Sequence, residues 1–275
     1  MSIHSEHIWL RNIPEQTTHA ICEKALRYAF YSLPFTVNRM KIDSPEQRLL
    51  NIFKGKIAEG LFLEFLKVQG IYANTEKCET PYYLPDKRDF VLSGYEWDIK
   101  NNYLLCSDFQ GIDTGNLPAL IPDRFSGDQW TQREKLLFSE SKGLVYVFTF
   151  MPLFAANHDL ISLQITEDQL ITLRTMCNQW NNQHQVSEPY TAYALNNLFF
   201  GSRTIEECYQ IHAPLQMLIT AVAGPLQWQL FYPKLPGEFA NGKLKTRIRN
   251  RFCHVENLPS FKNLFSSALN KIHWQ

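Results

Sequence analysis

The chain has 275 residues, of which 45% are hydrophobic, and its 27 lysines and arginines balance 27 aspartates and glutamates. This composition is typical of a globular protein and excludes disordered and collagen-like chains. No apolar run approaches the roughly 18 residues that a membrane helix needs, and the opening MSIHSEHIWL lacks a secretory leader. We therefore expect a cytoplasmic protein without a membrane partner. Zero net charge argues against coating nucleic acid by bulk charge, but it allows a local basic patch.

Six cysteines are spread singly along the chain, and no two of them form a CxxC pair. Zinc ribbons and iron–sulfur clusters need closely spaced ligands, so neither is supported. We expect the cysteines to be buried thiols in a reducing compartment.

Two helices are predicted in the first seventy residues. The first covers about residues 18–33. The second begins after Ser44, which is suited to be its N-cap, with Pro45 at the first helical position and Gln47 at the third. Apolar residues then recur at helical spacing until Gly70. This pattern predicts a core helix of about 23 residues.

From Arg88 the pattern changes to short extended runs. RDFVL and YEWDIKNNYLL flank Ser93-Gly94, a two-residue turn that is typical of an antiparallel hairpin. Residues 106–129 hold three glycines and two prolines, which predicts a long ordered loop. A helix over about 128–141 is expected to lead into GLVYVFTF, a strand buried on both faces.

The second half is less informative. We expect a capped helix after Thr166, another after Thr204, and an apolar segment at 215–222. A buried strand with flanking helices indicates an α/β or α+β fold.

The hairpin carries the residues that point to chemistry. Pairing through the Ser93-Gly94 turn places Asp89 across from Asp98, and period two places Lys100 on the same face. Two adjacent carboxylates repel unless a cation lies between them, and oxygen ligands suit Mg²⁺. A nearby lysine can orient an attacking water or stabilise charge on a phosphate. This combination is suited to phosphodiester hydrolysis.

Asp89 and the triplet Asp98-Ile99-Lys100 resemble the PD-(D/E)xK nuclease superfamily, in which an acidic residue ends one strand and an acidic-x-Lys triplet lies on the next. The superfamily often adds a glutamate from a preceding helix in a G-x-x-x-E pattern, which Gly55 and Glu59 match. The resemblance implies Asp89, Asp98 and Glu59 as metal ligands, with Lys100 as the fourth catalytic residue. Mg²⁺ is the expected metal, and Mn²⁺ is an alternative.

The resemblance covers residues 44–150 and implies a restriction endonuclease-like core with a central mixed sheet flanked by helices. A helical segment at 1–43 would precede it. Residues 151–275 would form a mainly helical extension for substrate binding or dimerisation, or part of the same domain. The literal Pro-Asp pair lies at Pro85 and Asp86. Asp86 is therefore an alternative first ligand, although only Asp89 lies across from Asp98.

A basic alternation lies near the C-terminus. Cations occupy every second position from 243 to 251, and a continuous strand would place all five on one face about 6.6 Å apart, close to the spacing of phosphates along a nucleic-acid strand. They are Lys243, Lys245, Arg247, Arg249 and Arg251. This row is a candidate nucleic-acid contact. The alternative is a sheet edge protected by positive charge.

The leading hypothesis is a Mg²⁺-dependent endonuclease of the restriction, repair or defence type, acting on DNA in preference to RNA. Cutting both strands of a duplex would favour a homodimer. The alternative is a non-catalytic nucleic-acid-binding or assembly subunit that retains a nuclease-like fold. The hairpin charges could also be a solvated face, and Glu59 could be an ordinary helix residue like Glu64.

Overall fold

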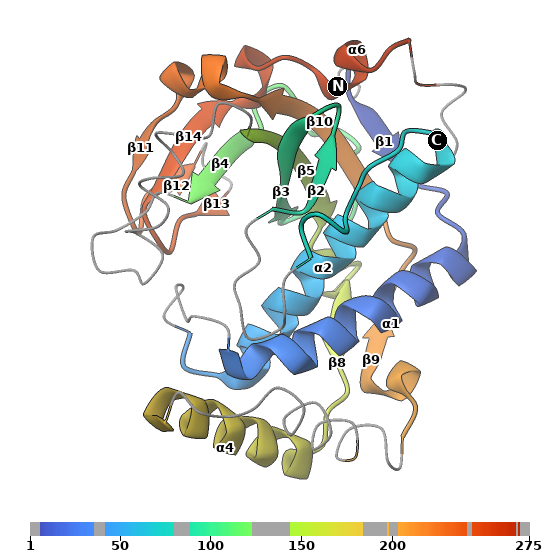
Figure 1. Ribbon diagram of the computed structural model, residues 1–275, viewed down its shortest axis with the longest axis vertical. Helices are drawn as coiled ribbons and strands as arrows, with labels where there is room; N and C mark the ends of the chain where they lie inside the picture. Colours follow the sequence, from blue (N-terminus) through green and yellow to red (C-terminus); the bar gives the residue numbers. More distant parts are fainter. Residues whose placement is uncertain are drawn as a thin grey trace.

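The computed structural model describes residues 6–35, 42–79, 88–122, 144–183, 197, 203–240, 244–267 and 269. The helix expected over 128–141 lies outside these residues, as do Asp86 and Lys243. Within them the chain has a mixed α/β fold with a curled mixed sheet and several helices (Figure 1).

Two long helices cross in the first part of the chain, as the sequence predicts. They are α1 (Glu15–Ser32) and α2 (Pro45–Val68), with a 3₁₀ turn η1 (Leu33–Phe35) between them. The Ser44 side chain caps α2 by accepting a hydrogen bond from the backbone N–H of Gln47 at 3.1 Å. A Cβ on Gly60 would lie 2.7 Å from Cγ2 of Ile21, so this glycine permits the close crossing of the two helices.

The main sheet has five strands, and β5 lies at its centre. The order is β1–β10–β5–β3–β2, in which β3 and β5 are parallel and the other neighbours are antiparallel. The β5 strand is the predicted GLVYVFTF run, and it is almost entirely buried. The strands are β1 (Ile8–Leu10), β2 (Phe90–Leu92), β3 (Tyr95–Leu104), β5 (Leu144–Pro152) and β10 (Met217–Ala223).

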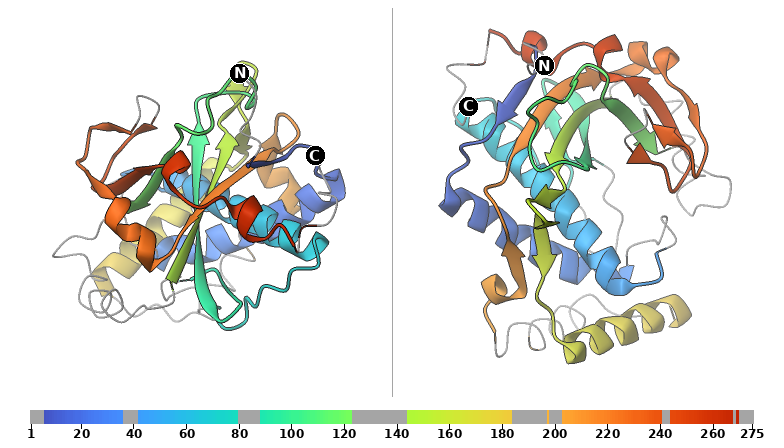
Figure 2. Two further views of the ribbon diagram at one scale, coloured as in Figure 1. Left: turned by 90° about the horizontal axis from the view of Figure 1, so that it is seen from above. Right: turned by 180° about the vertical axis from the view of Figure 1, so that it is seen from behind.

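A second, three-stranded sheet lies beside the first, and together the strands form an arch (Figure 2). Its order is β11–β14–β4, all antiparallel, with β4 (Pro118–Pro122), β11 (Tyr232–Lys234) and β14 (Asn250–His254). Short two-stranded pairings complete the strands, namely β6 (Phe154–Ala155) with β7 (His158–Asp159), β8 (Ile161–Leu163) with β9 (Tyr209–Ile211), and β12 (Phe239–Ala240) with β13 (Leu244–Lys245).

The remaining helical elements are mostly short. They are α4 (Glu167–Gln183), α6 (Phe261–Leu264) and the 3₁₀ turns η2 (Ile205–Cys208), η3 (Pro225–Leu230) and η4 (Val255–Asn257). The cap expected at Thr166 is present, because its hydroxyl accepts from the backbone N–H of Gln169 at 3.3 Å. No helix among the described residues is both long and apolar enough to cross a membrane.

Two hydrophobic cores hold the layers together. One lies between the helices and the sheet face that carries Trp97 and Val147, and it includes Phe53 and Phe62 of α2. The other lies against the opposite face, where Tyr146 packs with residues of the three-stranded sheet such as Cys253. The polar side chains at 96, 98 and 100 alternate with Trp97 along β3, so they occupy the second of these faces.

Three expectations need correction. Residues 118–122 were expected to belong to a long loop, but they form strand β4, which pairs with β14. The prolines at both ends of this strand favoured the loop prediction. The helix expected after Thr204 is only the turn η2, although Glu207 does accept from the backbone N–H of Thr204 at 2.8 Å. The described residues beyond 150 are not mainly helical, since they include strands β6 to β14. Most of these strands have two to five residues, too few to show a period in sequence.

Candidate active site

The β2–β3 hairpin has the register that its turn predicts. Phe90 pairs with Trp97, and the turn residues Ser93-Gly94 have φ values of 52° and 81°, as a type I′ turn requires. The ladder ends at this pair, because the backbone N–H of Asp89 also donates to the carbonyl oxygen of Trp97, at 2.9 Å, one residue short of Asp98. The pairing of Asp89 with Asp98 therefore stays a prediction.

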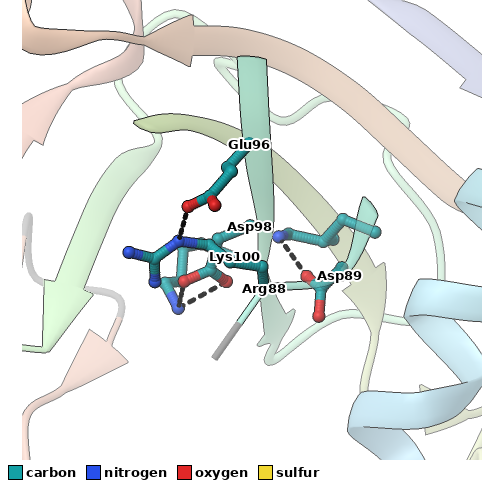
Figure 3. A network of polar contacts seen from close by, with 6 residues as sticks. Arg88, Asp89, Glu96, Asp98 and Lys100 are labelled. Carbon is teal, nitrogen blue, oxygen red and sulfur yellow. Dashed lines mark hydrogen bonds and ion pairs between the residues drawn. The ribbon is translucent and has the colours of Figure 1, made fainter. Parts of the chain in front are cut away.

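Lys100 and Asp98 form a close ion pair on one face of β3 (Figure 3). The Lys100 Nζ lies 2.7 and 2.6 Å from the two carboxylate oxygens of Asp98. The side chains are 23% and 17% exposed, and the Lys100 Nζ lies 5.5 Å from the centre of the Tyr146 ring. This pair is mostly shielded from water, so a fully solvated face does not describe it.

Asp89 lies immediately before the first residue of β2. Its Oδ2 accepts a hydrogen bond from the backbone N–H of Ile99 at 2.5 Å, which satisfies a donor of β3 that has no strand residue opposite it. Burial raises the pKa of Asp89 well above its ordinary value, and the carboxylates of Glu59 and Asp98 raise it further. The Lys56 ammonium and the Ile99 hydrogen bond oppose this increase in pKa.

Helix α2 contributes Glu59 together with a lysine that sequence reasoning missed. The Lys56 Nζ contacts the Glu59 Oε2 at 2.5 Å, and the two side chains are 18% and 22% exposed. The same ammonium lies 4.4 Å from the centre of the Tyr28 ring of α1. The sequence signal for Lys56 was its position three residues before Glu59, on the same helix face. The Lys56–Glu59 pair of α2 is thus also in contact with α1.

Arg88 is a second residue that the sequence reasoning did not single out. It is 9% exposed, and its Nε donates to Oε2 of Glu96 at 2.7 Å (Figure 3). It adds a buried positive charge next to the carboxylate cluster, a name used here for Glu59, Asp89 and Asp98. A hollow of about 1490 Å³ between α1, α2 and residues 70–79 is walled in part by Lys56, Glu59, Arg88 and Asp89. Two of the three carboxylates are therefore accessible from this hollow.

The donor set fits a hard divalent cation in its chemistry. All three members of the carboxylate cluster offer oxygen, and the pKa of Asp89 is raised first by burial and further by the carboxylates of Glu59 and Asp98. As arranged in the described part of the chain, however, no three His, Cys, Asp or Glu side chains are close enough to hold a metal ion. Glu59 and Asp98 each form an ion pair with a lysine. A metal ion would therefore have to displace these lysines from the two carboxylates.

The basic row is not one continuous strand, which corrects the sequence expectation. Lys245 ends β13, Arg247 lies in the bend that follows, Arg249 lies between this bend and β14, and Arg251 lies in β14. The cause is Thr246, whose buried hydroxyl donates to the carbonyl oxygens of Leu235 and Glu238, at 2.6 and 3.0 Å. These bonds hold the chain to the preceding turn and redirect it before β14.

Comparison of the chain with protein-family models, with curated protein sequences and with solved structures gave no match in any of the three.

Proposed function

We propose that this protein is a metal-dependent nuclease that hydrolyses phosphodiester bonds, acting on DNA in preference to RNA, with a restriction endonuclease-like core in residues 44–150. The observation that carries the proposal is the carboxylate cluster with Lys100 beside it. Helix α2 supplies Glu59, and the hairpin that follows it supplies Asp89 and Asp98. This order along the chain is the order that the nuclease resemblance implies.

Each residue has a distinct role in this proposal. Asp89 and Asp98 would hold Mg²⁺, or Mn²⁺ in its place, and Glu59 would hold or orient it. A bound ion would neutralise the carboxylates and act as a Lewis acid toward a phosphate oxygen. Lys100, released from Asp98, would position the attacking water and stabilise negative charge that develops on the phosphate.

Lys56 is a positioning residue in the same scheme. It contacts Glu59 rather than the reacting atoms, and its place over the Tyr28 ring restricts where the Glu59 carboxylate can point. Supporting partners of this kind commonly change metal affinity or activity by about 10- to 100-fold when removed.

The test is a digestion panel of plasmid, linear, single-stranded and branched DNA, together with RNA, incubated with Mg²⁺ or Mn²⁺. We expect cleavage by the wild type and none by Asp98→Ala or Lys100→Ala, each shown to be folded by its circular dichroism spectrum. Glu64→Gln is the matched control, because Glu64 pairs with Lys67 on the same helix at the same spacing, outside the cluster. Equal behaviour of wild type and Asp98→Ala on every substrate would remove the catalytic proposal.

A non-catalytic nucleic-acid-binding subunit is the second candidate. The observation that favours it is the pairing of Glu59 and Asp98 with lysines, which neutralises two of the three carboxylates without any metal. Salt-sensitive binding of nucleic acid, without cleavage under any of the metal conditions, would support this candidate over the first.

A further inference from the structure

Exposed apolar side chains concentrate in one stretch of the described chain. Of eleven large hydrophobic residues that are exposed, five lie between residues 226 and 239. They are Leu226, Leu230, Tyr232, Leu235 and Phe239. The two aromatic members are 45% and 56% exposed. Such a concentration is typical of a binding surface, whereas single exposed hydrophobic residues are ordinary.

The two aromatic residues belong to strands that meet at the buried ring of Phe252. Tyr232 pairs with Phe252 across β11 and β14, with ring centres 5.0 Å apart. Phe252 packs in turn with Ala240 and Leu244 of the β12–β13 hairpin. Phe239 is adjacent to Ala240 along β12, so period two directs it away from the sheet and toward solvent.

Cations accompany these rings. The Lys234 Nζ lies 5.9 Å from the centre of the Tyr232 ring, and the Lys245 Nζ lies 6.0 Å from that of Phe239. Arg247 follows on the exposed bend. The sequence from 231 to 254 contains six lysines and arginines and one glutamate, a net charge of +5 in a chain whose total is zero. We call Tyr232, Lys234, Phe239, Lys245 and Arg247 the cation–aromatic face.

The positive charge of this face indicates what kind of partner it can bind. A second copy of the chain would bring the same positive face against its own, which Coulomb repulsion opposes. A polyanion is attracted, and a polyanion that also offers flat apolar rings would cover the exposed aromatic residues. Duplex DNA keeps its bases stacked on one another, whereas a single strand exposes base faces for stacking on protein aromatic residues.

We propose that the cation–aromatic face binds single-stranded nucleic acid, with bases stacked on Tyr232 and Phe239 and phosphates near Lys234, Lys245 and Arg247. The inference rests on the proposed function for its partner class, and it adds that the substrate is held as an unpaired strand. It involves elements β11 to β14, which lie apart from the β2–β3 hairpin (Figure 1).

The test measures fluorescence anisotropy of a labelled 20-nucleotide strand of DNA or RNA with the full chain in EDTA, so that binding is separated from cleavage. We expect both single strands to bind more tightly than the corresponding duplex. Phe239→Ala should weaken binding by at least about fivefold, and Phe239→Trp should retain it, because stacking of one base commonly contributes about 1–3 kcal/mol. Phe239 is exposed, so this variant does not threaten the fold.

The contribution of the cations to binding is measured separately, from the salt dependence of the affinity. Lys245→Gln should reduce the slope of log K against log salt by about 0.7, the value for one phosphate contact on a single strand. Controls on α4 are Ile171→Ala, matched for exposure, and Arg174→Gln, matched for charge, and neither should change binding. Polyphosphate, which has charge but no bases, should compete poorly at equal charge concentration.

The outcomes separate the two proposals. Binding that polyphosphate abolishes as well as DNA does, or that Phe239→Ala leaves unchanged, overturns the inference even if the protein cleaves DNA. Self-association through this face, lost in Phe239→Ala, would overturn it as well. Single-strand binding by Asp98→Ala equal to that of the wild type, in a protein without nuclease activity, supports the inference and removes only the catalytic proposal.

Discussion

The carboxylate cluster and the cation–aromatic face hold charge in opposite ways. In the cluster, Glu59 and Asp98 each have a lysine within 2.7 Å, and their side chains are mostly buried. In the cation–aromatic face, cations of one sign gather on an exposed surface beside aromatic rings. Partly buried, paired charges are fixed in position, whereas exposed charges of one sign create a field that salt weakens. The first region is therefore suited to chemistry and the second to affinity.

The largest effect is expected from Asp98→Asn, which removes a charge from the cluster and the partner of Lys100. Cleavage should fall by roughly a thousandfold or more, equivalent to about 4 kcal/mol of transition-state stabilisation. Single-turnover rates on nicked plasmid would measure it, with Asp108→Asn, a half-buried loop carboxylate outside the cluster, as the control. A fall of less than tenfold would mean that Asp98 is not part of the chemistry.

A smaller effect is expected from the helix contribution. Glu59→Gln should lower cleavage by about 10- to 100-fold, while Glu64→Gln leaves it unchanged, because Glu59, unlike Glu64, raises the pKa of Asp89. The measurement is the metal concentration at half-maximal rate for both variants. Equal curves for the two variants would show that Glu59 is an ordinary helix residue.

The turn beneath the cation–aromatic face can be perturbed through Thr246. Thr246→Val leaves the carbonyl oxygens of Leu235 and Glu238 without this donor, which should lower the free energy of unfolding by about 1–3 kcal/mol. Urea denaturation would measure it, with Thr175→Val on the exposed surface of α4 as control. An unchanged midpoint would mean that the bend is held by other contacts.

The smallest change is expected in the pH dependence of stability. Since the folded-state pKa of Asp89 is raised, the folded protein binds a proton more readily than the unfolded chain, and stability falls as pH rises above the unfolded value of about 3.9. The charged groups that shift this pKa are Glu59 and Asp98, which raise it, and Lys56, which lowers it. In EDTA, Asp89→Asn should therefore gain stability relative to the wild type as pH increases beyond that value.

Thermal melts of the two proteins at several pH values would measure this difference. Added Mg²⁺ should stabilise the wild type and have less effect on Asp89→Asn, because a ligand stabilises only a state that binds it. A constant difference in melting temperature across the pH series would contradict the assigned environment of Asp89.

The two regions also differ in how far sequence predicted them. The hairpin register followed from Ser93-Gly94, because a two-residue turn fixes every pairing next to it. Helix α2 followed equally from its cap and apolar spacing. The pairing of Lys56 with Glu59 was accessible from its helical spacing, although only the crossing of α1 and α2 explains its burial.

The prediction that the basic row forms one continuous strand was wrong, because alternation of residues alone does not reveal a bend. Thr246 reads as one more residue of a strand, and its bonds to Leu235 and Glu238 depend on a turn eight to eleven residues earlier. Strand β4 was missed for a similar reason, since its partner β14 lies more than a hundred residues further along the chain. Pairings of that range leave no periodic signal within either segment.

The place of β1 in the main sheet affects how the chain can be assembled. Its partner Ile219 lies far along the chain from Ile8, and β10 also supplies the antiparallel neighbour of β5. During synthesis, β1 and β5 both have unpaired edges until β10 emerges from the ribosome. Contacts of such long range fold slowly and leave strand edges open to other chains. We therefore expect a nascent chain arrested before residue 217 to depend on chaperones, and a complete chain to need them much less.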